Sequence, residues 1–168
     1  FQPINVFFML PSCVPATELE TSGARLTGFD LYPFLSEKWV LGLGEVMDYP
    51  GLVVANEDLI DKIKITVSKR IDGHAPGLSG KDLSAYIASG VASDHESTTI
   101  EEAKEKLRKG MFVMIREGTS TRNLDTLISL VNKDNYKNFI FVTDDRHPHD
   151  LVSEGSINFL IKKSIRMG

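Results

Sequence analysis

Carboxylate and imidazole side chains stand at or directly after several short apolar runs of this sequence. Glu45 follows the run 40–44, and His74 closes a weaker one. His95 and Asp144 each come shortly after the end of a later run. Imidazole and carboxylate together suit zinc, manganese or iron better than calcium. The pattern therefore indicates that these side chains share a metal site.

Each of these groups also has an ordinary structural interpretation. The segment 72–77 could be a glycine-rich turn, and the acids of 94–96 could cap a helix N-terminus, where negative charge is favoured. The segment 144–147 could be a surface turn with local ion pairs. Glu45 is the hardest to explain in this way, because an acid that closes a Leu-Gly-Leu-Gly strand should be buried. A buried carboxylate needs a metal, a cation or a proton.

Short apolar runs alternate with amphipathic segments along the chain. The runs expected to be strands are 5–10, 40–44, 70–74, 90–93, 111–115 and 139–142. The expected helices are 58–68, 79–90, 100–109, 124–131 and 157–165. Short runs that are apolar on both faces fit a parallel sheet covered by helices. The alternation predicts an α/β fold with about six βα units, either an open doubly wound sheet or a barrel. In a barrel the strand ends converge on one face, where active sites lie.

The helix before Gly110 has the clearest end signals in the sequence. Thr98 or Thr99, with Glu101 or Glu102 three residues later, makes a capping box in which each side chain bonds to the other residue's backbone N–H. Gly110 is a natural stop, because glycine readily adopts the left-handed conformation that ends helices. These signals predict both ends of this helix.

Composition sets bounds on the class of protein. The chain has 168 residues, 42% of them hydrophobic and 25% charged, which are ordinary values for a soluble domain. Its net charge of -4 argues against a general nucleic-acid binder. No apolar run approaches the roughly 18 residues of a membrane span. The single cysteine, Cys13, cannot form an internal disulfide, so a reducing, cytoplasmic location is expected. We expect one domain over 1–168 with no nucleic-acid or membrane partner.

The sequence gives little support to a nucleotide-binding site or to a cysteine nucleophile. Gly42-Leu43-Gly44 does not extend to the dinucleotide-binding pattern G-x-G-x-x-G, because Met47 takes the place of the third glycine. The phosphate-binding pattern G-x-x-x-x-G-K-[ST] does not occur, which argues against a nucleotide-binding doubly wound domain. Cys13 would need a positioned base to act as a nucleophile. A small residue at a strand end is its preferred interpretation.

Five sequence blocks occur in a characteristic order. They are Leu-Pro-Ser-Cys-Val-Pro-Ala-Thr at 10–17, Gly-Leu-Gly-Glu-Val-Met at 42–47, Asp-Gly-His-Ala-Pro-Gly-Leu at 72–78, Ser-Asp-His-Glu at 93–96 and Thr-Asp-Asp-Arg-His-Pro at 143–148. Over essentially the whole chain, the ordered set resembles the adenine deaminases of the amidohydrolase superfamily. The resemblance implies a partial parallel (β/α) TIM-type barrel of the metal-dependent hydrolase kind, from its third to its eighth strand.

The resemblance also implies a divalent metal pair of manganese, iron or zinc, and ligands for it. Glu45 matches the carboxylate that bridges the two metals. His74 and His95 match the histidine ligands after the fifth and sixth strands. Asp144 matches the aspartate after the eighth strand, which binds metal and handles the proton of the attacking hydroxide.

Other residues at the same strand ends receive less specific roles from the resemblance. Arg116 and Glu117 end the seventh strand, where they would contact the base or transfer a proton; Glu117 is the second catalytic candidate. Asp145 is adjacent to Asp144 and stays an alternative for its role. Cys13, Arg116 and Asp145 are the candidate substrate-binding residues.

The activity that the resemblance implies is hydrolysis of adenine to hypoxanthine and ammonia in purine salvage, by a cytoplasmic homo-oligomer. The family's first-strand His-x-His pair, its first two strands and its small β domain are missing. We therefore expect the chain to be part of a longer protein and to be inactive alone. Two alternatives stay open: another amidohydrolase that acts on a cyclic amide, and a non-catalytic truncated barrel fragment.

Overall fold

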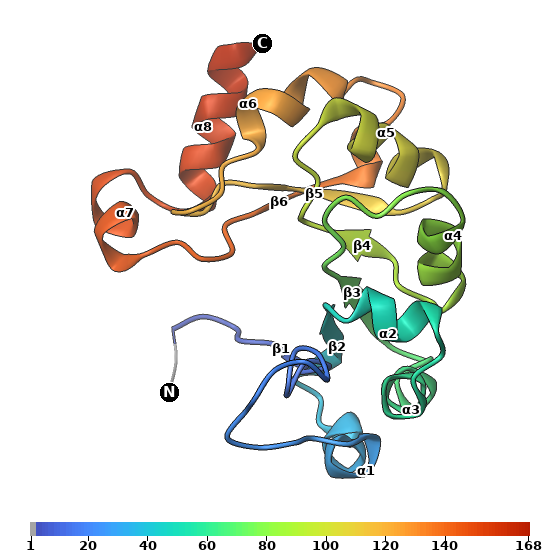
Figure 1. Ribbon diagram of the computed structural model, residues 1–168. Helices are drawn as coiled ribbons and strands as arrows, with labels where there is room; N and C mark the ends of the chain where they lie inside the picture. Colours follow the sequence, from blue (N-terminus) through green and yellow to red (C-terminus); the bar gives the residue numbers. More distant parts are fainter. Residues whose placement is uncertain (1–2) are drawn as a thin grey trace. The chain divides into compact units, whose positions relative to one another are not determined.

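The computed structural model describes residues 3–168, which form two compact units (Figure 1). Within these residues, unit 1 comprises 3–75 and Gly80–Ser93, and unit 2 comprises Pro76–Ser79 and Asp94–Gly168. Strand β4 (Ser93–Asp94) begins in unit 1 and ends in unit 2. The expectation of one domain over 1–168 stays a prediction.

Six strands belong to one sheet, in the order β1-β2-β3-β4-β5-β6. Besides β4, they are β1 (Phe8–Leu10), β2 (Val40–Val46), β3 (Arg70–Gly73), β5 (Phe112–Arg116) and β6 (Phe139–Val142). The pairs β1–β2, β2–β3 and β5–β6 are parallel. The α/β class predicted from the apolar runs is confirmed, and the sheet is compatible with part of a TIM-type barrel.

Unit 1 also contains short helices. They are α1 (Gly28–Leu31), the 3-10 helix η1 (Tyr32–Ser36), α2 (Tyr49–Val53), α3 (Glu57–Ile65) and α4 (Gly80–Ala88). Helix α2 packs on both α3 and α4, and Figure 1 shows it between them. Leu43 and Val46 of β2, Ile71 of β3, and Leu83 and Tyr86 of α4 are buried and form part of the core of this unit.

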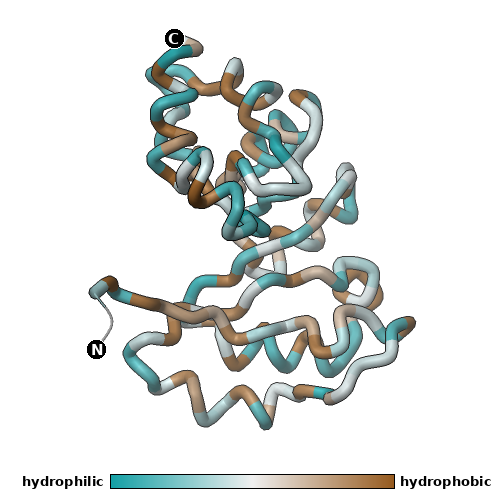
Figure 2. Tube along the Cα trace, turned by 90° about the vertical axis from the view of Figure 1, so that its left-hand side faces the viewer, coloured by the Kyte–Doolittle hydropathy of each residue, from teal (hydrophilic) through white to brown (hydrophobic). Residues whose placement is uncertain are grey.

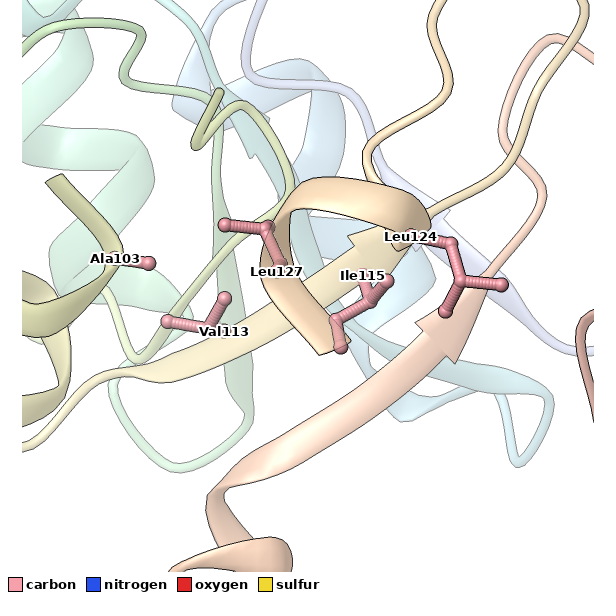
Figure 3. Close-up of a cluster of buried hydrophobic side chains, with 5 residues drawn as sticks. All are labelled: Ala103, Val113, Ile115, Leu124 and Leu127. Carbon is pink, nitrogen blue, oxygen red and sulfur yellow. The ribbon is translucent and has the colours of Figure 1, made fainter. Parts of the chain in front are cut away.

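Unit 2 packs helices on β5 and β6. Its elements are α5 (Ile100–Arg108), α6 (Leu124–Leu127), the 3-10 helices η2 (Ile128–Leu130) and η3 (Tyr136–Asn138), α7 (Pro148–Ser153) and α8 (Ile157–Met167). Figure 3 shows the core between these elements, formed by the fully buried Ala103, Val113, Ile115, Leu124 and Leu127. Alternate residues of β5 supply two of these side chains, because successive strand residues point to opposite faces.

Helix α5 starts at the predicted N-cap and ends before Gly110, but the predicted capping box is incomplete, because the Glu102 side chain bonds to the backbone N–H of Thr98 and not to that of Thr99. Thr99 is the N-cap, and its side chain accepts a hydrogen bond from the backbone N–H of Glu102 at 3.2 Å. Glu102 in turn accepts from the backbone N–H of Thr98 at 3.1 Å. The helix ends before Gly110, which has a φ of +92°.

Several elements differ from the predictions in length or existence. Helices α1, α2 and α7 were not predicted, because helices of four to six residues are too short to show hydrophobic periodicity. Strand β4 has only two residues, fewer than the apolar run 90–93 indicates. The predicted helix 124–131 is split, with α6 passing into the tighter η2.

The first strand is unusually apolar and exposed. Figure 2 shows the segment that leads into β1 as a nearly continuous hydrophobic stretch near the N-terminus. Phe7 is 50% and Phe8 is 58% exposed, and β1 is the first strand in the sheet order. Exposed apolar edge strands are aggregation-prone, and proteins usually cover or pair them.

Gly42 lies where β2 passes very close to β3. A Cβ on residue 42 would lie 1.8 Å from the carbonyl oxygen of Arg70 and 2.6 Å from its carbonyl carbon. Because both are backbone atoms, the strand itself must shift. We expect Gly42→Ala to lower the free energy of unfolding by about 3 kcal/mol, as overpacking does, when measured by urea denaturation. Gly28→Ala is the control, since its Cβ would meet neighbours only at 3.5 Å or beyond; equal losses in both variants would contradict this prediction.

Candidate functional site

Glu45 and His74 come together in unit 1. Glu45 lies on β2 and His74 directly follows β3, so the parallel pairing brings both to the same edge of the sheet. The Oε2 atom of Glu45 is 3.5 Å from the Nδ1 atom of His74. The Glu45 side chain is 31% exposed. It is therefore less buried than its place at the end of an apolar strand predicts.

The pairing of β2 with β3 is irregular where Glu45 lies. Leu43 pairs with Ile71. Val46 pairs with Gly73, so β2 advances one residue more than β3 between the two pairs. The extra residue makes a β-bulge in the segment that holds Glu45. Bulges re-aim side chains and are frequent beside active sites.

Cys13 follows β1 in unit 1 and is half-buried. Burial raises the pKa of its thiol, and the negative charge of Glu45 raises that pKa further. A thiol of raised pKa stays protonated near neutral pH and is a poor nucleophile. These properties agree with the interpretation of Cys13 as a small residue at a strand end. Its role as a substrate contact stays a prediction.

In unit 2, Arg116 at the end of β5 joins two carboxylates. Its Nη1 donates to Asp144 Oδ2 at 2.9 Å and also to Glu96 Oε1. His95 is 8% exposed, and its Nε2 lies 3.4 Å from the same Glu96 oxygen. Desolvation lowers the pKa of Arg116, but its hydrogen bonds and charge interactions with Glu96 and Asp144 outweigh that effect and raise it. One charged network thus connects His95 with Asp144.

Asp94, the neighbour of His95, is held inside unit 2. Its carboxylate is fully buried, and its Oδ2 accepts from Lys106 Nζ at 2.8 Å. The same oxygen accepts from the backbone N–H of Glu96 at 3.0 Å and from the Ser97 hydroxyl at 3.1 Å. Asp94 therefore organises the turn that follows β4 and positions the backbone beside His95.

Glu117 is fully buried and is held by structural partners. Its Oε1 accepts from Lys163 Nζ at 2.7 Å. Its Oε2 accepts from the backbone N–H of Leu124 at 3.3 Å, at the N-terminus of α6. The hydrogen bonds and charges of Glu117 and Asp125 raise the pKa of Lys163 against the opposing effect of desolvation. The structure thus places the Glu117 carboxylate against α6 and α8, and its catalytic role stays a prediction.

Asp144 and Asp145 have different environments, although they are adjacent. Asp144 is exposed and pairs with Arg116, and its φ of +50° is a left-handed conformation that aspartate tolerates better than most residues. Asp145 accepts from the backbone N–H groups of Thr119 and Ser120, each at 3.0 Å. Its hydrogen bonds with Ser120, foremost that of the side chain, lower its pKa. Asp145 therefore holds the loop after β5, whereas the Asp144 carboxylate is open to solvent.

Two polar residues were missed by the sequence analysis. Glu96 connects His95 to Arg116, and Lys106 neutralises the buried Asp94. Glu96 had a signal, because it is adjacent to a candidate ligand. Lys106 had none, since a lysine on an amphipathic helix is normally solvent-exposed.

The helices of residues 3–168 include none that is long and apolar enough to cross a membrane.

Comparison with known proteins shows that the chain is similar in sequence to part of several adenine deaminases. No family model matches the chain. The chain is 54% identical over 166 residues to adenine deaminase 2 of Carboxydothermus hydrogenoformans. It is 49% identical over 168 residues to adenine deaminase of Desulfatibacillum aliphaticivorans. It is 53% identical over 174 residues to adenine deaminase of Thermosipho africanus. Each alignment covers 99% of this chain but only 29% to 30% of the relative. The chain is therefore homologous to somewhat less than a third of an adenine deaminase.

Proposed function

We propose, from this homology to adenine deaminases, that the chain is part of an enzyme that hydrolyses adenine to hypoxanthine and ammonia. The observation that carries the proposal is an identity of about 50% over 99% of the chain. The strand-end carboxylates and imidazoles support it, because hydrolysis of a C–N bond in a cyclic amidine needs an activated water and groups that transfer protons.

The fold that we propose for the complete enzyme is a TIM-type barrel of the metal-dependent hydrolase kind, to which this chain contributes the third to the eighth strand. The sheet order, in which each strand neighbours the next along the sequence, supports this fold. The exposed Phe7 and Phe8 also support it, because an apolar edge strand is expected to be paired or covered in the complete protein.

Four residues are the proposed ligands of a divalent metal pair: Glu45, His74, His95 and Asp144. Two carboxylates and two imidazoles suit manganese, iron or zinc. Glu45 and His74 fit such a group, since their ligand atoms already lie 3.5 Å apart at one sheet edge. When bound, a metal pair supplies a water molecule that is acidic enough to lose a proton near neutral pH.

Asp144 is the proposed proton carrier. Its carboxylate is 38% exposed, and the hydrogen bond from Arg116 holds one of its oxygens. The carboxylate is thus oriented but open to a reacting water. It would take one proton of the attacking water and pass it to the purine ring nitrogen. It would then take the second proton from the hydroxyl formed on C6 and pass it to the amine that leaves as the C–N bond breaks.

Arg116 is the proposed contact to the base. Its Nε atom is buried and has no hydrogen-bond partner within the described part of the chain, and a buried donor without a partner costs free energy. Because this atom is not accessible to a ligand, the proposed role depends on the place of Arg116 at the end of β5, beside the exposed Asp144. Glu117 as a proton-transfer group and Asp145 and Cys13 as substrate contacts stay predictions, as do the purine-salvage role, the homo-oligomer and the cytoplasmic location.

Glu45→Gln in the full-length protein tests the metal site and the activity together. The amide removes the negative charge of a proposed metal ligand. Loss of a residue that only supports a ligand weakens metal binding by roughly 10- to 100-fold, and we expect Glu45→Gln to weaken it by more than that. Ammonia release from adenine should fall with it. Metal content by elemental analysis and ammonia release from adenine are the measurements.

The matched control is Glu20→Gln, which removes the same charge from an exposed position. It should keep both metal content and activity. The proposal is wrong if Glu45→Gln retains wild-type metal affinity, or if the wild-type enzyme hydrolyses a cyclic amide but releases no ammonia from adenine.

A further inference from the structure

The bulge in β2 interrupts the backbone pairing of β2 with β3 beside the proposed ligands Glu45 and His74. An extra residue in one strand interrupts the regular ladder of backbone hydrogen bonds. The direct bond across the end of the pair, from the backbone N–H of His74 to the carbonyl oxygen of Val46, is long at 3.4 Å. Polar backbone groups in buried positions need other partners. Here the segment Glu45–Val46 finds them in two side-chain hydroxyls.

Tyr86 of α4 provides the first of these hydroxyls. Its side chain is fully buried. The hydroxyl donates to the carbonyl oxygen of Val46 at 2.6 Å and accepts from the backbone N–H of His74 at 3.0 Å. One oxygen thus joins the residue after Glu45 to the backbone of His74 itself.

Gly73 leaves the space that this hydroxyl occupies. A Cβ on residue 73 would lie 2.6 Å from the Tyr86 hydroxyl oxygen and 2.5 Å from the carbonyl oxygen of Ser93. Both distances are far below ordinary van der Waals contact. The glycine between Asp72 and His74 is therefore needed for the tyrosine hydroxyl to reach the ends of β2 and β3.

Ser12, two residues after the end of β1, provides the second hydroxyl. It is 6% exposed, and its Oγ donates to the carbonyl oxygen of Glu45. The two consecutive carbonyls of the bulged segment, those of Glu45 and Val46, are therefore each held by a hydroxyl. One comes from the loop after β1 and the other from helix α4.

We propose that Tyr86 and Ser12 are positioning residues, whose hydroxyls fix the bulged segment of β2 and thereby set the Glu45 carboxylate against the His74 imidazole. The inference rests on the proposed function, in which these two side chains bind metal. Packing alone does not explain the hydroxyl of Tyr86, because phenylalanine would fill the same space without a buried polar atom. The hydrogen bonds of this hydroxyl to the backbone of Val46 and His74 explain why position 86 has a tyrosine.

The test compares metal affinity in full-length variants, measured by competition with a chelator at a temperature well below unfolding. Tyr86→Phe and Ser12→Ala each remove one hydroxyl. We expect each to weaken metal binding about 10- to 100-fold, as loss of an outer-shell partner does. Tyr32→Phe is the control, since Tyr32 is 65% exposed and should bind metal like the wild type.

A purely structural role for these hydroxyls predicts a different result. Tyr86→Phe and Ser12→Ala would then unfold at lower temperature but bind metal with wild-type affinity while folded, which would overturn the inference. Should Tyr86→Phe fail to fold, Ser12→Ala decides, because it removes a small side chain and leaves the core of α4 intact. Unchanged metal affinity in Ser12→Ala would then count against the inference.

Glu45→Gln separates this inference from the proposed function. If Glu45→Gln binds metal like the wild type, the proposed metal site is wrong. If Glu45→Gln loses metal but both hydroxyl variants bind it normally, only the positioning role is wrong.

Discussion

Replacing Asp144 by asparagine in the full-length protein is expected to lower kcat for adenine deamination about 100- to 10,000-fold, the range for loss of a general acid–base group. An amide cannot carry the proton that the carboxylate would transfer. The fold should survive, because asparagine tolerates the left-handed φ of +50° at least as well as aspartate. Steady-state kinetics with metal supplied in excess, together with thermal unfolding, measures both effects.

Asp145→Asn is the matched control, because it makes the same chemical change one residue later. Its carboxylate bonds to the backbone of Thr119 and Ser120, so its loss should lower the free energy of unfolding by about 1 kcal/mol. Its effect on kcat should be much smaller than that of Asp144→Asn. If Asp145→Asn abolishes turnover at unchanged stability and Asp144→Asn remains active, the roles of the two aspartates are reversed.

Lys106→Met is expected to lower the free energy of unfolding by about 3 to 5 kcal/mol, the range for breaking a buried ion pair. Lys106 Nζ lies 2.8 Å from both Asp94 Oδ2 and Glu102 Oε1. The side chains of Lys106 and Asp94 are fully buried. Methionine fills a similar volume but leaves the Asp94 carboxylate without its cation. Urea denaturation of the protein measures the loss.

Lys104→Met is the control on the same helix, since Lys104 is exposed and its replacement should change stability by about 0.5 kcal/mol or less. Adding Asp94→Asn to Lys106→Met should recover part of the loss, because it removes the unpaired charge. If the free energy of unfolding of Lys106→Met lies within about 1 kcal/mol of the wild-type value, this prediction is wrong.

The sequence by itself determined the parallel α/β class, the positions of most strands and the start and end of α5. These features depend on local signals, namely apolar runs and side chains that cap a helix within one turn. The sequence also determined that carboxylates and imidazoles follow the strands. Glu45 and His74 meet because their strands are parallel neighbours, as the order of runs along the chain implies.

Only the tertiary structure decided what each of these groups touches. Glu117 was a catalytic candidate by its place after β5, but its carboxylate bonds to Lys163, which lies far along the chain on α8. Asp145 likewise bonds to the loop after β5, which leaves Asp144 as the exposed carboxylate. The carbonyl oxygens of Glu45 and Val46 accept hydrogen bonds from the hydroxyls of Ser12 and Tyr86, which come from other parts of the chain. Such contacts join residues distant in sequence, so no local pattern encodes them, and they decide which carboxylates are neutralised and which stay open to chemistry.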